Sequence, residues 1–295
     1  MSVSDDEISR RDFLNKTAKA GLVFYTIGPL SAISPTPLRK NKKTTPSTKA
    51  GETEPHRYID QSLCIGCGKC EPLCPLEAIT LGEETSSIDP DECAECGACF
   101  REEICPADAI KPVKLKWPRD LRETFSNPLA VHKSTGITGR GTEGIKTNDS
   151  QNRYKRGEIG VFIEVGRPVL GGRFSDVERI VKKFKANGYT VIPQNPISDL
   201  IDDPKTGALK PEILNERVIS CVIEFNLPNS AAGKLMTIVG ELAREVDSLF
   251  SLSVGLRADE QWKAQFEEIF GPDVSRFPNA KANIGVLRPV AAEEA

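Results

Sequence analysis

Eight of the nine cysteines in this chain of 295 residues fall between Cys64 and Cys105. Only Cys221 lies outside that window, and the chain has just two histidines, His56 and His132, so a His-rich metal site is excluded. Thiols at this density either hold metal or pair as disulfides, and their spacing distinguishes the two. The spacing is therefore the first feature to interpret.

The cysteines form two copies of one motif that begin 29 residues apart. The first copy is Cys64-x2-Cys67-x2-Cys70-x3-Cys74-Pro75, and the second is Cys93-x2-Cys96-x2-Cys99-x5-Cys105-Pro106. Both copies continue with a small or apolar residue, an acidic residue, Ala and Ile. This agreement indicates an internal duplication with pseudo-twofold symmetry.

Over about residues 58–116 the pattern resembles the bacterial-type ferredoxin that carries two [4Fe–4S] clusters. In that family the fourth cysteine of each copy binds the cluster held by the other copy. The resemblance implies two ligand groups, here named the first cysteine set (Cys64, Cys67, Cys70 and Cys105) and the second cysteine set (Cys93, Cys96, Cys99 and Cys74).

The residues between the cysteines carry further predictions. Gly66, Gly68 and Gly97 lie inside the loops, where a backbone close to inorganic sulfide needs positive φ or a tight approach. Five residues separate Cys99 from Cys105 where the first copy has three, which predicts an outward bulge. All eight ligands remain, so two four-iron clusters are expected rather than a three-iron cluster.

Two other frameworks stay open from the residues alone. An oxidising compartment would permit disulfides, and zinc also binds groups of four cysteines. Zinc sites usually pair two Cys-x2-Cys knuckles rather than runs of four, and the doubled pattern ending in Cys-Pro favours iron–sulfur clusters.

Four thiolates per cluster leave no open iron site for a substrate, so single-electron exchange is the chemistry expected. We therefore expect an electron carrier rather than an enzyme, either alone or as a subunit of an oxidoreductase complex, with a redox partner protein. A second hypothesis is a redox- or ligand-sensing binding protein. A third is a self-contained enzyme, for which the sequence offers no nucleophile–base pair or flavin motif.

The N-terminal region, residues 1–34, resembles a twin-arginine export signal. Ser9-Arg10-Arg11-Asp12-Phe13-Leu14 precedes an apolar stretch from Gly21 to Ile33, which is shorter than the ~20 residues that span a bilayer. The resemblance implies export to the periplasm or the outer face of the cytoplasmic membrane, with membrane association only through an uncleaved leader. A formal net charge of −3 gives no basic field for nucleic acid.

Polar linkers are expected at residues 35–57 and 117–157. The second contains Gly139-Arg140-Gly141-Thr142-Glu143-Gly144, formally a G-x-G-x-x-G, but neither a strand before it nor a helix after it is visible. A connecting loop is therefore predicted here rather than a dinucleotide site.

Residues 158–258 predict the element order βαββαβ, the split βαβ plait. Strands are expected at 161–165, 189–192, 218–225 and 250–256. One helix should begin at a capping box, Ser175 to Glu178, and end at Asn187-Gly188, and the other should begin at 228–230. The layout resembles ACT-type modules, which implies a possible small ligand. The loop 193–217 is a candidate docking or ligand loop, and Cys221 is expected to be a buried structural thiol.

A C-terminal helix and tail are expected at 259–295, with Trp262, Phe266, Ile269 and Phe270 on one side of the helix. The predicted fold class is α+β, with a small dicluster ferredoxin domain joined to a βαββαβ sandwich domain.

Overall fold

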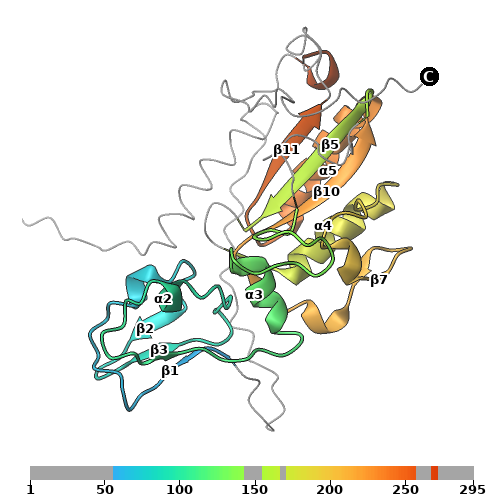
Figure 1. Ribbon diagram of the computed structural model, residues 1–295. Helices are drawn as coiled ribbons and strands as arrows, with labels where there is room; N and C mark the ends of the chain where they lie inside the picture. The colour runs from blue at the N-terminus through green and yellow to red at the C-terminus, as the bar shows by residue number, and fades with distance from the viewer. Residues whose placement is uncertain (1–55, 143–154, 167–170, 257–266, 272–295) are drawn as a thin grey trace, which may run out of the picture.

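The computed structural model describes residues 56–142, 155–166, 171–256 and 267–271. Figure 1 shows the cysteine-rich module beside a larger domain of sheet and helices, with α3 between them. The predicted leader, the end of the G-x-G-x-x-G stretch, Trp262 and Phe266 lie outside these residues. Within them, no helix is long and apolar enough to cross a membrane.

The cysteine-rich module is built on two short antiparallel strand pairs. β1 (Tyr58–Ile59) pairs with β4 (Ile110–Lys111), which joins the two ends of the module. β2 (Ile79–Leu81) and β3 (Ser86–Ile88) form the hairpin between the two cysteine motifs. The apolar core is small: Ile59, Cys70, Ile79, Ala109 and Ile110, with further cysteines packed against it.

The duplication is visible in the backbone angles. Gly66, Gly68 and Gly97 have φ of 64°, 67° and 71°, which confirms the predicted left-handed positions. A Cβ on Gly66 would lie 2.3 Å from the carbonyl oxygen of Glu84, so a side chain has no room there. The residue equivalent to Gly66 in the second copy is Glu95, whose φ is 53°.

The two additional residues of the second copy are absorbed by a helical turn. The first copy has a 3-10 turn at Glu71–Leu73, whereas the second forms α2 (Ala98–Arg101). Glu103, just after α2, returns the chain toward Cys105 with φ of 48°. The predicted bulge thus takes the form of a single helical turn.

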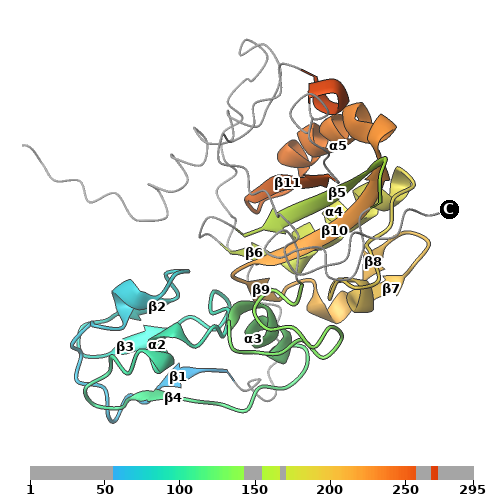
Figure 2. The same ribbon diagram turned by 45° about the horizontal axis from the view of Figure 1, so that its top comes forward.

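The larger domain contains a three-stranded antiparallel sheet in the order β10–β5–β11 (Figure 2). The strands are β5 (Glu158–Val165), β10 (Cys221–Pro228) and β11 (Phe250–Leu256). α4 (Phe174–Ala186) and α5 (Ala232–Glu245) pack against each other and against this sheet. Alternate strand residues face these helices because side chains of a strand point to opposite faces in turn.

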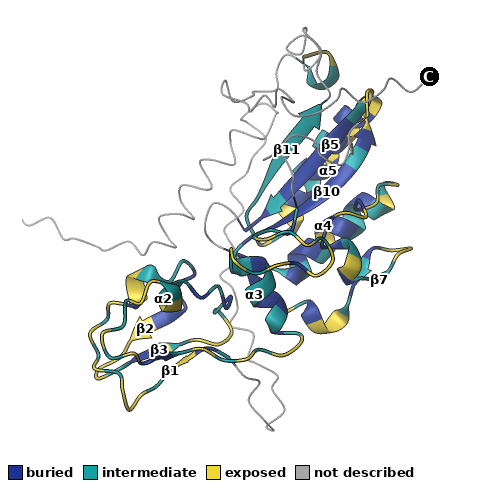
Figure 3. Ribbon diagram, in the orientation of Figure 1, coloured by how far each residue is buried: buried dark blue, intermediate teal, exposed yellow. Residues whose placement is uncertain are grey.

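Each of the two helices buries one apolar stripe. Val177, Ile180, Val181 and Phe184 of α4, and Leu235, Ile238, Val239 and Leu242 of α5, are all buried. Figure 3 shows the same pattern, with dark blue on β5, β10 and the inner sides of the helices. Cys221 is fully buried in this core, as predicted.

Three local predictions in this domain are wrong. The expected strand 189–192 is reduced to an isolated bridge between Val191 and Phe225, and Pro193, which has no N–H to donate, follows directly. The expected strand 218–225 is divided: β9 (Arg217–Val218) pairs with β6 (Gly172–Arg173), and β10 begins only at Cys221.

The predicted capping box is also absent. α4 begins at Phe174, one residue before the expected N-cap Ser175, and the side chain of the observed N-cap, Arg173, makes no capping hydrogen bond. The Glu178 carboxylate instead accepts a hydrogen bond from the Leu209 amide at 3.1 Å. The glutamate is thus used for tertiary contact rather than for helix initiation.

The long connection 193–217 is ordered and packed. It contains 3-10 turns at Ser198–Leu200 and Pro211–Ile213, and a hairpin of β7 (Ile201–Asp203) and β8 (Ala208–Leu209). Its buried side chains include Ile197, Leu209 and Ile213. Burial of these residues accounts for the length of the loop, and its role in docking stays a prediction.

The expected linker 117–157 contains an unpredicted helix, α3 (Asp120–Ser126). Leu121 and Phe125, four residues apart, are buried in the core of the larger domain. The Phe125 ring meets Phe174 edge-on at 5.3 Å and His132 at 4.6 Å between centroids. The first part of this segment is therefore a packed connection between the two parts of the molecule.

Candidate iron–sulfur site

The second cysteine set lines one cavity. Cys93, Cys96 and Cys99 of the second copy and Cys74 of the first copy all border it, together with apolar side chains such as Ile79 and Ile88. The cavity contains about 370 Å³ of space not filled by atoms, part of it open to solvent. The fold thus brings Cys74 to the other three residues of its predicted set.

The first cysteine set lies around the small core of the module. Cys70 is part of that core, and Cys64 and Cys105 pack against it. Cys67 is exposed. The Cys64 and Cys67 thiols are close enough to Cys70 to raise its pKa by like-charge interaction, after the larger effect of burial. The assignment of Cys105 to this set stays a prediction.

Backbone N–H groups point at the sulfur atoms in matching places of the two copies. Ala78 donates to Cys74 Sγ and Ala109 donates to Cys105 Sγ, each at 3.2 Å. The amide of Glu95 donates to Cys93 Sγ at 3.4 Å. Such hydrogen bonds favour the charged thiolate, the form that binds metal, so the donor geometry fits a metal cluster at both crossing cysteines.

Burial acts against the thiolates of the second set. It raises the pKa of Cys93 to about 12 and that of Cys99 to about 11, and it also raises the pKa of Cys96. Metal coordination deprotonates thiols outright. A cationic cluster core would therefore supply the charge that these buried sulfur atoms need in order to ionise.

The nine cysteines carry free thiols and form no disulfide in the structure. In the described ranges, no three His, Cys, Asp or Glu side chains gather closely enough to hold a single metal ion.

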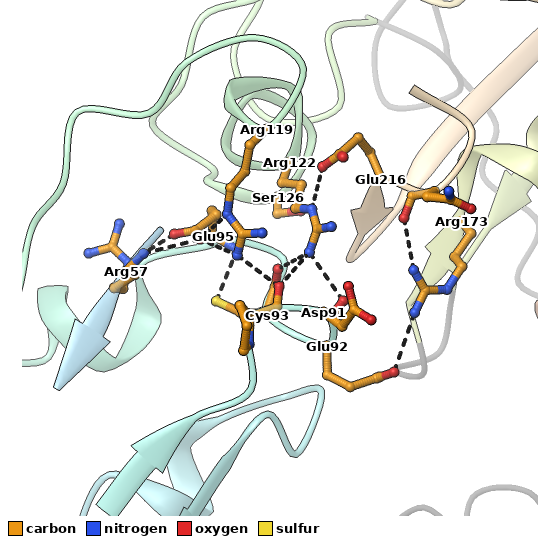
Figure 4. A network of polar contacts seen from close by, with 12 residues as sticks. Arg57, Asp91, Glu92, Cys93, Glu95, Arg119, Arg122, Ser126, Arg173 and Glu216 are labelled. Carbon is orange, nitrogen blue, oxygen red and sulfur yellow. Dashed lines mark hydrogen bonds and ion pairs between the residues drawn. The ribbon is translucent and has the colours of Figure 1, made fainter. Parts of the chain in front are cut away.

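A buried ionic network lies beside Cys93 of the second set (Figure 4). Glu95, with no exposed surface, accepts hydrogen bonds from the Arg57 amide at 3.2 Å and from Arg119 Nε at 2.9 Å. The guanidinium groups of Arg57 and Arg119 also form ion pairs with its carboxylate, at 3.6 and 2.7 Å. One carboxylate therefore holds two buried arginines beside the cysteine loop.

Arg122 of α3 ties this network to the larger domain. Its Nη1 donates to the carbonyl oxygens of Pro90, Asp91 and Cys93 at 2.9, 3.1 and 2.9 Å. Its Nε forms a buried ion pair with Glu216 of the larger domain. One guanidinium thus fixes the backbone of the second cysteine loop against a residue more than 90 positions away.

Two further contacts complete this side of the site. Arg101 of α2 donates to the carbonyl oxygen of Cys96 and, at 3.0 Å, to Asn127 Oδ1. Glu92 lies between Arg173 and Arg217 of the larger domain, at 3.4 and 3.0 Å. The second copy is thus held against the larger domain by several ionic contacts.

Sequence reasoning identifies the cysteines but misses this network. Arg57, Arg119 and Arg122 fall in segments predicted as linkers, and Glu95 is one acidic residue among several around the motifs. One sequence signal was available: Glu95 occupies the position of Gly66 in the first copy, where the backbone requires positive φ. A non-glycine residue with positive φ is uncommon and often marks a special contact.

Comparison with known proteins agrees with the cysteine pattern. Residues 57–80 match the family described as 4Fe-4S binding domain. The chain is 47% identical over 104 residues to ferredoxin Fdx2 of Sorangium cellulosum, covering 97% of that protein and 34% of this chain. It is 44% identical over 55 residues to a protein named Ferredoxin 7Fe from Hydrogenibacillus schlegelii, covering 68% of that protein and 18% of this chain.

A third relative is named as part of a larger assembly. This protein, from Methanosarcina acetivorans, is named as a subunit of an ion-translocating oxidoreductase complex. It is 50% identical to this chain over 48 residues, which are 17% of that protein and 16% of this chain. These matches support an iron–sulfur electron-transfer role for the cysteine-rich module. Because the similarity to the Sorangium protein spans almost the whole of that ferredoxin, the chain belongs, through this module, to the ferredoxin family.

Proposed function

We propose that the chain binds two [4Fe–4S] clusters and relays single electrons to or from a partner oxidoreductase. The cavity that unites Cys74 with Cys93, Cys96 and Cys99 is the observation that carries the proposal. Around this cavity three cysteines come from one copy of the motif and the fourth from the other, the arrangement that crossed ligation in dicluster ferredoxins requires. When bound, a [4Fe–4S] cluster supplies reversible one-electron transfer at a potential set by hydrogen bonds, charge and exposure.

The chain's own residues hold the two sets in different surroundings. At the first set, Cys67 is exposed and the neighbouring Ile65 is 67% exposed. At the second set, the sulfur atoms lie in a partly enclosed cavity, and the loop that carries them contacts the larger domain through Arg122. We infer that an external partner exchanges electrons at the first set.

The first experiment is iron and sulfide analysis of protein purified without oxygen, followed by electron paramagnetic resonance before and after reduction with dithionite. About eight irons per chain and a reduced spectrum of two interacting clusters are expected. About seven irons, as the name of the Hydrogenibacillus relative would suggest for this chain, would contradict the assignment of two four-iron clusters. Cys221→Ser is the matched control, because this buried thiol lies in the other domain and its loss should leave the iron content unchanged.

We also propose that the chain is exported by the twin-arginine route and acts outside the cytoplasmic membrane. Arg10 and Arg11, followed by Phe13-Leu14 and an apolar stretch, support this proposal. Replacement of both arginines by lysine preserves the charge and should leave the protein in the cytoplasm when cell fractions are probed. Unchanged export of the double-lysine variant would refute the route.

The redox partner is proposed to be a larger oxidoreductase, by analogy with the named assembly of the Methanosarcina relative. The test is chemical cross-linking of the loaded chain in its native host, followed by identification of the captured protein. Ile65→Asp should reduce capture while leaving the iron content unchanged, because Ile65 is exposed beside the first set. Capture of no redox protein would contradict the proposal.

A further inference from the structure

The second cysteine set is bordered by arginines, whereas the charged side chains near the first set are exposed and of both signs. Four arginines adjoin the second set. Arg57 lines its cavity, Arg101 donates to the Cys96 carbonyl, Arg122 donates to the Cys93 carbonyl, and Arg119 pairs with Glu95 in the loop between Cys93 and Cys96. The Arg57 Nη1 is buried and, within the described residues, has no hydrogen-bond partner.

Three of these four guanidiniums are shielded from solvent. Arg57, Arg119 and Arg122 are all buried, and an arginine keeps its charge at any ordinary pH. A buried charge is screened by salt and water far less than a surface charge. The buried carboxylates of Glu95 and Glu216 compensate two of these three charges, so one positive charge of the buried group remains beside the sulfur atoms.

The charged side chains near the first set are exposed instead. Lys69 and Glu71 flank Cys70, and Glu84 lies against the loop at Gly66, all on the surface. Water and salt weaken the effect of such groups. Arg57 opposes the increase in pKa at Cys99, and Arg101 and Arg57 oppose it at Cys96, but at Cys93 the negative charge of Glu95 raises the pKa more than Arg119 lowers it. The charges that act on Cys70 are those of Cys64 and Cys67.

We propose that the four arginines make the second cysteine set the more easily reduced of the two, so that an electron entering at the first set comes to rest at the second. This inference rests on the proposed function. A one-electron donor is oxidised as the first set accepts its electron. The first set is then reoxidised as the second is reduced, and no bond forms or breaks. Added negative charge is stabilised where fixed positive charge is nearest.

The opposite charges of the network give predictions of opposite sign. Arg119→Gln removes positive charge and should decrease the preference of the first electron for the second set about tenfold. Glu95→Gln removes the opposing negative charge and should increase that preference. Arg119→Lys keeps the charge and should change the preference of the first electron less than threefold. Arg244→Gln, which removes an exposed charge on α5, is the matched control and should leave this preference unchanged.

The experiment is a redox titration of the loaded full-length chain, followed by electron paramagnetic resonance. Cys67→Ser and Cys96→Ser, each of which alters one set, identify which signal belongs to which set. In the unaltered chain the second set should be reduced first, by at least tenfold, which for one electron corresponds to about 59 mV.

Equal potentials in the unaltered chain, or earlier reduction of the first set, would overturn the inference without any variant. Shifts of the same sign in Arg119→Gln and Glu95→Gln would also overturn it. If Arg119→Gln does not retain its clusters, the intact chain and Arg57→Gln, which should also lower the preference, still decide the question. A chain that holds no pair of clusters would instead refute the proposed function.

Discussion

Arg122 is expected to be the residue on which the contact between the cysteine-rich module and the larger domain depends most. Its guanidinium is buried, pairs with Glu216, and donates to three carbonyl oxygens of the segment from Pro90 to Cys93. Arg122→Leu keeps much of the volume but removes the charge and every one of these donors. Glu216 would then be left as a buried carboxylate without its partner.

The expected loss of stability follows from that geometry. Removal of one partner from a buried ion pair costs about 3–5 kcal/mol, because the other charge remains buried and unpaired. In a fold of this size, ~1 kcal/mol lowers the thermal midpoint by about 2–4 °C. Arg122→Leu should therefore lower the midpoint of the loaded protein by roughly 10 °C.

The matched control is Arg173→Leu at the same interface. Its partner Glu92 lies at 3.4 Å, and the two side chains are 31% and 27% exposed. A partly exposed pair contributes only about 0–1 kcal/mol, so this variant should lose a few degrees at most. The double variant Arg122→Leu with Glu216→Leu should recover part of the loss, because no buried charge then remains unpaired.

The assay combines the thermal midpoint with amide hydrogen exchange of the segment 90–93, whose exchange should increase in Arg122→Leu and stay unchanged in Arg173→Leu. The reasoning would be refuted if both single variants lost the same stability. It would also be refuted if the double variant were less stable than Arg122→Leu alone.

Three other predictions concern single residues. Cys74→Ser should remove about half of the iron and the signal of the second set rather than the first; loss of the first-set signal alone would contradict the assignment. Burial lowers the pKa of His132 below its ordinary 6.5. As the pH falls, the unfolded chain therefore binds a proton on this histidine before the folded chain does, and stability should decrease below pH 6.5. Thermal unfolding at pH 7.5 and 5.5 should show a smaller decrease in His132→Gln. Burial raises the pKa of Cys221 from 9.0 to about 12. The stability that comes from keeping this thiol protonated is therefore complete below pH 9 and lost as the pH rises toward 12. Cys221→Ala should show a shallower decrease in stability at alkaline pH.

The sequence was most informative where chemistry or periodicity restricts residue type. Cysteine spacing predicted which residues would gather, and the cavity does bring Cys74 to the second motif. Gly66 and Gly68 were predictable because few other residues accept their backbone angles. The helical stripes of α4 and α5 were predictable because the core-facing positions recur every three or four residues.

The rest depends on contacts between distant residues. Glu95 lies 38 positions from Arg57 and 24 from Arg119, and Arg122 lies 94 from Glu216, so no local pattern links them. α3 has only seven residues, too few for a clear helical period. The strand expected at 189–192 has the right residue types, yet Val191 reaches its neighbour through a single bridge before Pro193.

The network at Glu95 also sets where the ferredoxin module can be cut from the rest of the chain. A fragment that ended with the cysteine pattern, near residue 116, would keep all eight cysteines of the two motifs but lose Arg119 and Arg122. Glu95 would keep only Arg57 of its two arginine partners, and the carbonyl oxygens of Pro90 and Cys93 would lose their donor. The smallest transplantable unit therefore extends through α3, beyond the last cysteine by about two turns of helix and the segment that leads into it.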